Sequence, residues 1–532
     1  MTEPFALTAV EARQALIAGE LSSAELVESC LDRIARVDPK VNAMVTVAAE
    51  RARAEAAAAD VELAAAGDAD RGPHGRAQAR ARLMAAHPGS RHPEVGRPLL
   101  GLPVAIKDLQ ATAGVRTTLG SARFADQVPE VDAGIVARIR AAGGIVIGKT
   151  NIPERSIGAN TVNRLFGATG NPFDPTRTCG GSSGGSAVAL ATDMAPLATG
   201  SDHGGSLRIP AAYCGVVGFR ATPGVVPFEE RAVTQTFYSV QGPMARCVDD
   251  AALLLSVIAA REPHGRPASG PGAWLPTDPM AFPLNAAGRF GRLLPMDLAG
   301  VRVGVSEDLG GVLVSAEVRD QFRRRVDWLA DLVGSCEPVD IDLTDAADVD
   351  WNIRAELFAT SYQAEAATWD EEFNPNIRAS YEKALATPLA DIARARHRQM
   401  ELTRSFQAAM NDIDVLICPG VSVPPFPWSQ LYPASVDGAP VDNYMAWLTL
   451  TAAITVVGHP AVSLPAGLDD GGLPFGLQLI GSAYDDQHLL MVARAIEGAG
   501  VGTDFARPSP DLDALLASNV DLSPAATAAI FS

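Results

Sequence analysis

Apolar positions recur at helical spacing near the amino terminus of the chain. Between residues 9 and 38 they return every three or four positions, as at Leu26, Cys30 and Ile34. The segment Ser22-Ser23-Ala24-Glu25 fits a capping box, in which a serine and a glutamate three residues later satisfy the first amides of a helix. We therefore predict helices over residues 9–38.

From Pro98 onward, short apolar runs beside glycines alternate with helical segments. The runs predict buried strands at 102–106, 144–147, 301–305, 415–418, 461–464 and 476–480. A helix is predicted over 135–142. A second helix is predicted to end at Gly334, with an apolar face formed by Val318, Phe322, Val326, Leu329 and Val333. Strands that alternate with helices predict an α/β fold, with helices covering both faces of one large sheet.

Two segments lack this patterning. Residues 60–98 contain Pro, Gly and His between six arginines, which are Arg71, Arg76, Arg80, Arg82, Arg91 and Arg97. A charge-rich stretch of this kind is typical of a solvated surface insertion, here partly helical. The proline-rich stretch 419–433 predicts a long loop near a site or a rim.

The composition excludes several classes of protein. The 532 residues include 62 acidic and 43 basic side chains, which gives a formal charge of −19 and disfavours binding to nucleic acid or to anionic lipid. The six cysteines are scattered without a C-x-x-C pair, so neither a disulfide scaffold nor a zinc ribbon is expected. No secretory signal is evident, and the apolar runs fall well short of the about 18 residues that span a bilayer. We expect a cytoplasmic protein.

Two glycine-rich motifs imitate those of other enzyme classes. Residues 143–150 match the phosphate-binding pattern G-x-x-x-x-G-K-[ST], but the variable positions Gly-Ile-Val-Ile favour a strand rather than a loop. Residues 181–185 match G-x-S-x-G, the nucleophile elbow of α/β-hydrolases. That elbow needs a strand before the serine, whereas residues 171–179 are polar and interrupted by proline. Both interpretations are therefore disfavoured.

A third constellation uses more of the chain. It combines the loop Gly180–Ser186, the loop Gly200–Pro210 and Lys107, which follows the apolar run 102–106. Glycine allows a substrate carbonyl to approach backbone amides closely, and groups of such amides form an oxyanion hole. Either serine loop alone would be interpreted as a flexible connection, but chance does not account for the two together with the lysine.

With these three segments the chain resembles the amidase signature family, whose members hydrolyse amide bonds with a Ser–Ser–Lys triad. Further segments resemble the family over most of the chain, namely 9–47, 143–154, 215–223 and 461–481. The resemblance implies a single mixed, twisted sheet flanked by helices on both faces. It also implies one domain over residues 1–532, with a helical segment to about 60, the insertion at 60–98, a catalytic core at about 99–260, a pocket-forming segment at about 345–450 and a return to the sheet at about 455–500.

The same resemblance assigns roles by motif position. Ser206 matches the nucleophile, Ser182 the bridging serine and Lys107 the base, and the Gly181–Ser182 peptide bond is expected to be cis. Burial at a strand end would lower the pKa of Lys107 toward neutrality, as a general base requires. The oxyanion would be held by backbone N–H groups of His203, Gly204, Gly205 and Ser206. Neither a metal ion nor an organic cofactor is expected.

Four neighbouring side chains are candidates for supporting roles. Asp202 and Arg208 flank the nucleophile and are expected to form an ion pair that braces its loop. Ser183 and Thr178 either add hydrogen bonds to the proton relay or simply support the loop. The ring of His203 is expected to line the pocket entrance or to pack, while its amide acts.

The substrate is less defined by the sequence. We expect a small-molecule amide that is neutral and fairly hydrophobic, and the alternatives are a carbamate, an aryl amide or an ester. The amidase subunit of a tRNA-dependent amidotransferase is less favoured, because Ser201-Asp202-His203 and Phe219-Arg220-Ala221-Thr222 depart from its pattern. A non-catalytic relative is disfavoured because all three triad positions are filled. Many relatives are homodimers, so a homodimer stays an alternative. Aromatic residues that either line the pocket or pack in the core are Trp351, Phe358, Tyr362, Tyr444 and Trp447.

Overall fold

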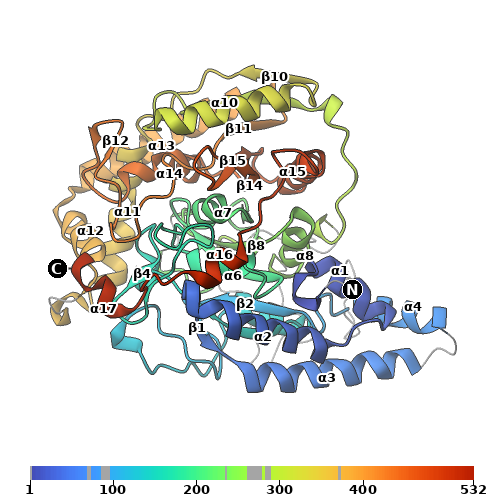
Figure 1. Ribbon diagram of the computed structural model, residues 1–532. Coiled ribbons are helices and arrows are strands. Elements are labelled where there is room, and N and C mark those ends of the chain that lie inside the picture. Colours follow the sequence, from blue (N-terminus) through green and yellow to red (C-terminus); the bar gives the residue numbers. More distant parts are fainter. Residues whose placement is uncertain are drawn as a thin grey trace.

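A large mixed sheet forms the centre of the protein in the computed structural model (Figure 1), which describes residues 3–68, 73–85, 96–233, 236–259, 278–281, 289–369 and 373–531. Within these residues eleven strands pair in the order β1-β3-β2-β6-β8-β7-β14-β15-β11-β9-β10. Their bounds are Met44–Val47 (β1), Pro103–Lys107 (β2), Ile145–Thr150 (β3), Leu197–Asp202 (β6), Val217–Arg220 (β7), Val240–Ala245 (β8), Arg302–Val305 (β9), Ser335–Pro338 (β10), Val415–Pro419 (β11), Ala461–Leu468 (β14) and Pro474–Ile480 (β15). Two small hairpins add Val162–Asn163 (β4) with Gly167–Ala168 (β5), and Ser435–Val436 (β12) with Ala439–Pro440 (β13).

The sheet contains both strand orientations. Strand β2 is parallel to its neighbours β3 and β6, and β9 is parallel to β10 and β11. Between these parallel blocks, β8, β7, β14 and β15 run antiparallel to their neighbours. The mixed α/β sheet predicted from the sequence is confirmed. Because β2 and β6 are parallel, their carboxyl ends meet at one edge, where Lys107 and Ser201 lie.

Helices surround the sheet along its whole width, with α10 beside the β10 edge and α2 and α3 beside the β1 edge in Figure 1. The α-helices are Ala9–Ala18 (α1), Ser23–Val41 (α2), Ala49–Asp68 (α3), Pro73–Leu83 (α4), Gly134–Ala141 (α5), Gly184–Ala191 (α6), Arg208–Cys214 (α7), Val248–Ile258 (α8), Ala316–Ala330 (α10), Ala346–Tyr362 (α11), Pro375–Ala386 (α12), Leu389–Ala409 (α13), Thr449–Val457 (α14), Asp486–Gly500 (α15), Leu512–Ala517 (α16) and Pro524–Thr527 (α17). Short 3-10 helices occur at Pro4–Ala6, Ala122–Phe124, Glu154–Ser156, Leu298–Gly300, Ala366–Thr368, Ala446–Leu448 and Ala528–Ile530.

The predicted helical start of the chain is confirmed, including its capping. The Ser22 hydroxyl accepts from the Glu25 amide at 3.1 Å, and the Glu25 carboxylate accepts from the Ser22 amide at 2.8 Å. Helix α1 carries a second capping box at Thr8, and its first two amides donate to Asp250 of α8. These contacts connect the amino-terminal helices to the sheet core.

The predicted strands are all present with small shifts of their ends, and residues 420–433 form the expected loop. One helix boundary was wrong. Helix α10 ends at Ala330, so Val333 lies beyond it in the turn before β10. Strands β1, β6, β7, β8 and β10 of the main sheet were not predicted, because in most of them glycine, proline or polar residues interrupt the apolar ones. The burial of β6, β7 and β8 comes from neighbouring strands on both sides.

The arginine-rich segment 60–98 is helical over most of its described part, in the end of α3 and in α4. Arg97 pairs with Glu62, and Arg80 donates to the Leu63 carbonyl at 3.0 Å, so these arginines hold the segment against α3. Residues 69–72 and 86–95, with Arg71 and Arg91, lie outside the described residues. The single-domain boundaries inferred from the resemblance remain a prediction.

Two small apolar clusters lie over the carboxyl-end side of β2 and β6. One joins α7 to the loop residues 421–448 and includes Tyr213, Tyr444 and Trp447. The other joins α11 to α12 and includes Phe358 and Ile377. Tyr444 of the first cluster and Phe358 of the second line a pocket together with residues of the two serine loops. In the part of the chain that the structure describes, no helix combines the length and hydrophobicity needed to cross a bilayer.

Candidate active site

Lys107 is the polar centre of the site. It is the last residue of β2 and is fully buried. Its Nζ atom donates to three hydroxyl oxygens, those of Ser182 at 2.8 Å, Ser183 at 2.9 Å and Ser201 at 2.8 Å. Burial lowers the pKa of Lys107 to about 7, and the more distant Asp202 only partly opposes this effect. A substantial fraction of this lysine is therefore neutral near pH 7.

The loop before α6 brings Ser182 and Ser183 to this lysine. The Gly181–Ser182 peptide bond is cis, as the resemblance implies. Thr178 holds the loop from behind, because its hydroxyl accepts from the Gly180 amide at 3.0 Å and donates to Asn160 at 2.8 Å. Thr178 thus supports the backbone of the loop, whereas Ser183 contacts Lys107 directly.

The second serine loop joins β6 to α7 and is organised by Asp202. This carboxylate accepts from the amides of Gly205 and Leu207, at 3.0 and 3.1 Å. It also forms buried ion pairs with Arg208 at 2.8 Å and Arg220 at 3.3 Å. Burial raises the pKa of the Asp202 carboxyl, but the two arginines outweigh burial and hold that pKa below its usual value. The side-chain carboxylate of Asp202 therefore fixes the backbone of the loop that follows it.

Helix α14 fixes the other side of the same loop. The Thr455 hydroxyl donates to the His203 carbonyl at 2.5 Å, and the Thr451 hydroxyl donates to the Gly204 carbonyl at 2.6 Å. In the trans peptide between His203 and Gly204 the C=O and N–H bonds point in opposite directions. Because the His203 carbonyl points toward Thr455 of α14, the Gly204 N–H points away from that helix. Gly205 has a φ of +121°, and a Cβ there would lie 2.3 Å from the Thr451 hydroxyl oxygen, so only glycine fits.

The two loops are joined by their backbones, because the Ser183 amide donates to the Ser206 carbonyl at 3.2 Å. Four backbone amides were expected to form the oxyanion hole, and the amide of Gly205 is not free to do so. Its N–H already donates to Asp202. The prediction of four free donors was wrong for Gly205, because the Asp202 carboxylate lies within hydrogen-bond distance of its N–H.

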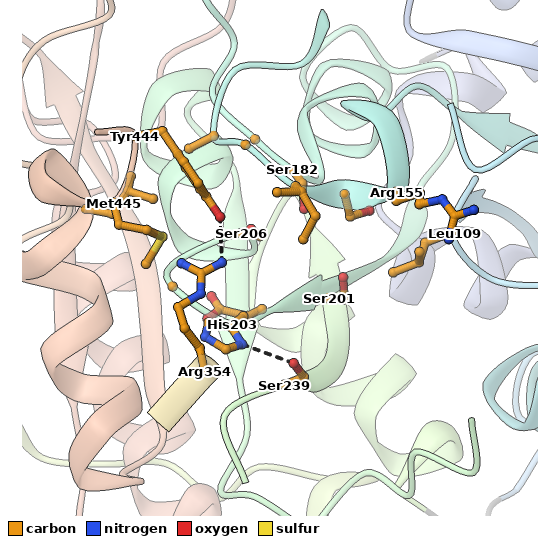
Figure 2. Close-up of a pocket in the computed structure, with 18 of the residues that line it drawn as sticks. Leu109, Arg155, Ser182, Ser201, His203, Ser206, Ser239, Arg354, Tyr444 and Met445 are labelled. Carbon is orange, nitrogen blue, oxygen red and sulfur yellow. Dashed lines mark hydrogen bonds between the residues drawn. The ribbon is translucent and has the colours of Figure 1, made fainter. Parts of the chain in front are cut away.

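A pocket with a cavity volume of about 130 Å³, partly open to solvent, begins at these serines (Figure 2). Ser182 and Ser206 lie in its wall, together with Phe358 and Tyr444. The five aromatic candidates all pack in or against the two apolar clusters, and Trp351, Tyr362 and Trp447 do not line the pocket.

The ring of His203 also lines the pocket, but both of its nitrogens are engaged. Nδ1 lies 3.2 Å from the Ser239 hydroxyl, and Nε2 lies 3.1 Å from Asp350 of α11. The ring additionally meets Tyr238 edge-on, with centroids 5.4 Å apart. His203 therefore connects the loop between β6 and α7 to the pocket wall formed by α11.

Sequence reasoning missed two functional candidates, Ser201 and Arg354. Ser201 belongs to β6, a strand that the sequence pattern did not predict, so its place beside Lys107 follows only from the pairing of β6 with β2. Arg354 lies on α11 and lines the pocket. No local motif marks it, and only the packing of α11 above the serine loops reveals it.

Lys149, the lysine that matches the phosphate-binding pattern, forms hydrogen bonds inside the protein core. Lys149 lies within β3 and is fully buried. It donates to the Gln110 carbonyl and to the hydroxyls of Thr112 and Thr117, and Asp108 is 4.0 Å away. Burial lowers its pKa to about 7, with Asp108 opposing. The prediction that residues 145–147 form a strand rather than a phosphate loop is confirmed.

The comparisons with known proteins agree with this geometry. A family model described as Amidase matches residues 76–490. The chain belongs to the amidase signature family. Among the described residues of this amidase signature hydrolase, no three His, Cys, Asp or Glu side chains cluster to hold a metal ion.

Three similar proteins illustrate the range of this family. A glutamyl-tRNA(Gln) amidotransferase subunit from Roseiflexus sp. (strain RS-1) is 33% identical over 96% of this chain and 99% of its own length. The structure of a bacterial aryl acylamidase of the amidase signature family has a TM-score of 0.76 and 26% identity, covering 93% of this chain and 96% of its own. The peptide amidase of Stenotrophomonas maltophilia has a TM-score of 0.71 and 27% identity, covering 96% and 100%.

Proposed function

We propose that this protein hydrolyses the carbon–nitrogen bond of a small, neutral and fairly hydrophobic amide through an acyl-enzyme on Ser206. The observation that carries the proposal is the contact of Lys107 Nζ with Ser182 Oγ at 2.8 Å, at the base of a pocket that Ser206 also lines. A buried amine with a lowered pKa beside a serine hydroxyl has the properties of an activated nucleophile system.

In the proposed first step, neutral Lys107 accepts a proton from Ser182, and Ser182 accepts the proton of Ser206. The Ser206 Oγ atom then forms a bond to the substrate carbonyl carbon. The resulting oxyanion is stabilised by backbone N–H groups of the loop 203–206. The Gly204 N–H is one such donor, because Thr455 of α14 binds the His203 carbonyl of the same peptide and the N–H points away from it. His203 and Ser206 contribute further amides, while Gly205 stays bound to Asp202.

Collapse of the tetrahedral intermediate breaks the carbon–nitrogen bond, and the relay returns a proton to the leaving amine. Water then attacks the acyl-enzyme with the same relay acting as base, which releases the acid and restores Ser206. Each step moves one proton along Lys107, Ser182 and Ser206, so no metal ion or cofactor is required. Ser183 and Ser201 orient the lysine through their own hydrogen bonds.

The apolar side chains of the pocket support a neutral substrate, as Phe358, Met445 and Leu448 line it beside the serines. A carbamate or an aryl amide presents the same carbonyl chemistry and is the alternative. The likeness to an aryl acylamidase at 26% identity over most of both chains supports including aryl amides among the candidates.

A second candidate is the amidase subunit of a tRNA-dependent amidotransferase. It is favoured by the 33% identity to such a protein over nearly the whole of both chains. In that case glutamine would be the amide donor and a partner protein would receive the ammonia. Release of ammonia from glutamine at a higher kcat/KM than from hydrophobic amides would favour this candidate over ours.

The experiment that tests the proposal is fluorophosphonate labelling followed by peptide mass mapping. We expect a phosphonyl adduct on Ser206 in the wild type and none on Ser206 in Ser206→Ala. The matched control is Ser156→Ala, since Ser156 lines the same pocket and its buried hydroxyl has no hydrogen-bond partner among the described residues. An adduct confined to another residue, or no adduct on the folded wild type, contradicts the assignment.

A further inference from the structure

Arg354 is a buried arginine in the pocket wall that does not use all of its hydrogen-bond donors among the described residues. It is 5% exposed and extends from α11 toward Tyr444 (Figure 2), whose hydroxyl accepts from its Nη2 atom at 2.5 Å. Its Nε and Nη1 atoms are buried and have no hydrogen-bond partner among the described residues. Buried donors are nearly always satisfied in folded proteins, so donors without a protein partner beside a pocket can be satisfied by a polar atom of a bound molecule.

Three aromatic rings and a single acceptor among the described residues, the Tyr444 hydroxyl, hold the guanidinium group in place. Its central carbon lies 4.7 Å from the ring centroid of Phe358, 5.3 Å from that of Trp351 and 5.5 Å from that of Tyr444. Ring faces attract the positive charge but do not replace an oxygen acceptor for the N–H groups. Arg354 is therefore fixed in orientation while two of its nitrogen atoms lack partners among the described residues.

The nearest carboxylate neutralises this charge without satisfying the donors. Asp350, one turn earlier on α11, has its Oδ2 atom 3.9 Å from Nη1, which is beyond hydrogen-bond distance. Its Oδ1 atom is bound by His203 at 3.1 Å. A substrate carboxylate at Arg354 would thus lie beside a second buried negative charge, whereas a neutral carbonyl oxygen would accept a hydrogen bond without that repulsion.

We propose that Arg354 binds a second, neutral carbonyl oxygen of the substrate, away from the carbonyl that Ser206 attacks. This inference rests on the proposed function, because it concerns the substrate of the same pocket. It narrows that substrate to molecules with two carbonyl groups, such as an amide that carries a further amide, carbamate or ketone. The rest of the ligand is apolar, to match the side chains around the guanidinium group.

The test uses matched fluorophosphonates, which react with Ser206 by forming a phosphorus–oxygen bond and releasing fluoride. In one series of probes a ketone carbonyl stands at successive positions of an alkyl chain. Each of these probes has a matched analogue with a methylene group in place of the ketone. A third series ends in a carboxylate. Second-order labelling rates are measured for the wild type, Arg354→Met and Arg354→Lys. Arg324→Met is the control, since Arg324 is an exposed arginine paired with Asp470 on the surface.

In the wild type we expect the ketone probe to label Ser206 about 10-fold or more faster than its methylene analogue at one or two chain positions, as a hydrogen bond from a charged donor predicts. The ratio should approach one in Arg354→Met, fall partly in Arg354→Lys and persist in Arg324→Met. Because the ratio is taken within each variant, a general loss of reactivity cancels.

Three results would overturn the inference. They are a wild-type ratio near one at every position, a ratio that survives in Arg354→Met even if both rates fall, and an equal Arg354-dependent advantage for the carboxylate probe. The second result would mean that Arg354 only joins α11 to Tyr444. If no probe labels Ser206 in the folded wild type, the proposed function itself fails, and the inference that depends on it fails too.

Discussion

Lys107 and Ser201 lie at the ends of adjacent parallel strands, and the lysine Nζ atom donates to the Ser201 hydroxyl at 2.8 Å. This distance equals that from Nζ to Ser182, the serine expected to relay the proton. Ser201 therefore helps to fix the direction of the lysine amine. It also stabilises the ammonium form, because a hydroxyl oxygen accepts a hydrogen bond from it.

Replacing Ser201 with alanine should shift the acid limb of the pH profile. Loss of an acceptor destabilises the ammonium form, so the pKa of Lys107 should fall and kcat/KM should begin to rise at a lower pH. We expect kcat at the optimum to fall roughly 10-fold from misorientation of the amine. A merely structural effect would lower the rate without moving the limb, and Ser239→Ala provides a comparison in the same pocket.

In the wild type, kcat/KM should increase with pH through the Lys107 pKa of about 7, since only the neutral amine accepts a proton. Lys107→Met should lose roughly 10³-fold or more in kcat, as expected when one member of a catalytic relay is removed. Residual activity with an unchanged pH profile in Lys107→Met would show that another group is the base.

Lys107 should also make folding stability depend on pH. Its folded pKa lies below that of the unfolded lysine, so the unfolded chain binds more protons between about pH 7 and pH 10. Stability should therefore rise with pH through this window, and the slope should be smaller in Lys107→Met. Denaturant unfolding at several pH values measures the slope, and identical slopes in the two proteins would contradict the burial effect.

Asp202→Ala should be among the most destabilising substitutions in the protein. It leaves Arg208 and Arg220 buried, each having lost its carboxylate partner. Removing one partner of a buried pair costs about 3–5 kcal/mol. Asp470→Ala breaks the exposed pair with Arg324 and should change the free energy of unfolding by less than about 1 kcal/mol. Urea unfolding of both variants checks the contrast, and similar losses would refute it.

Gly205→Ala should impair both folding and activity. The new Cβ would lie 2.3 Å from the Thr451 hydroxyl oxygen, and a φ of +121° is unfavourable for alanine. We expect a loss of about 1–3 kcal/mol in stability and a larger loss in kcat, because the backbone donors next to Ser206 would move. Gly300→Ala is the control, since its Cβ would meet nothing within 4 Å.

Local patterns in the sequence were sufficient for much of the fold. The capping box at Ser22 and the apolar runs that became β2, β3, β11, β14 and β15 depend on neighbours in the sequence, so they could be read directly. The resemblance also singled out Lys107 and Ser182, which the fold brings within 2.8 Å of each other. Their catalytic roles, and that of Ser206, stay predictions until labelling tests them.

Other features depended on the tertiary structure. The Gly205 amide is occupied because the loop folds back over Asp202, and Ser201 reaches Lys107 because β6 lies beside β2. Arg354 enters the pocket only through the packing of α11. The sequence by itself predicted a serine and lysine site and most of the helices and apolar strands around it, since these predictions depend on residue type and short-range spacing. Only the fold decided which groups meet, because hydrogen bonds and ion pairs require proximity between residues far apart in the chain.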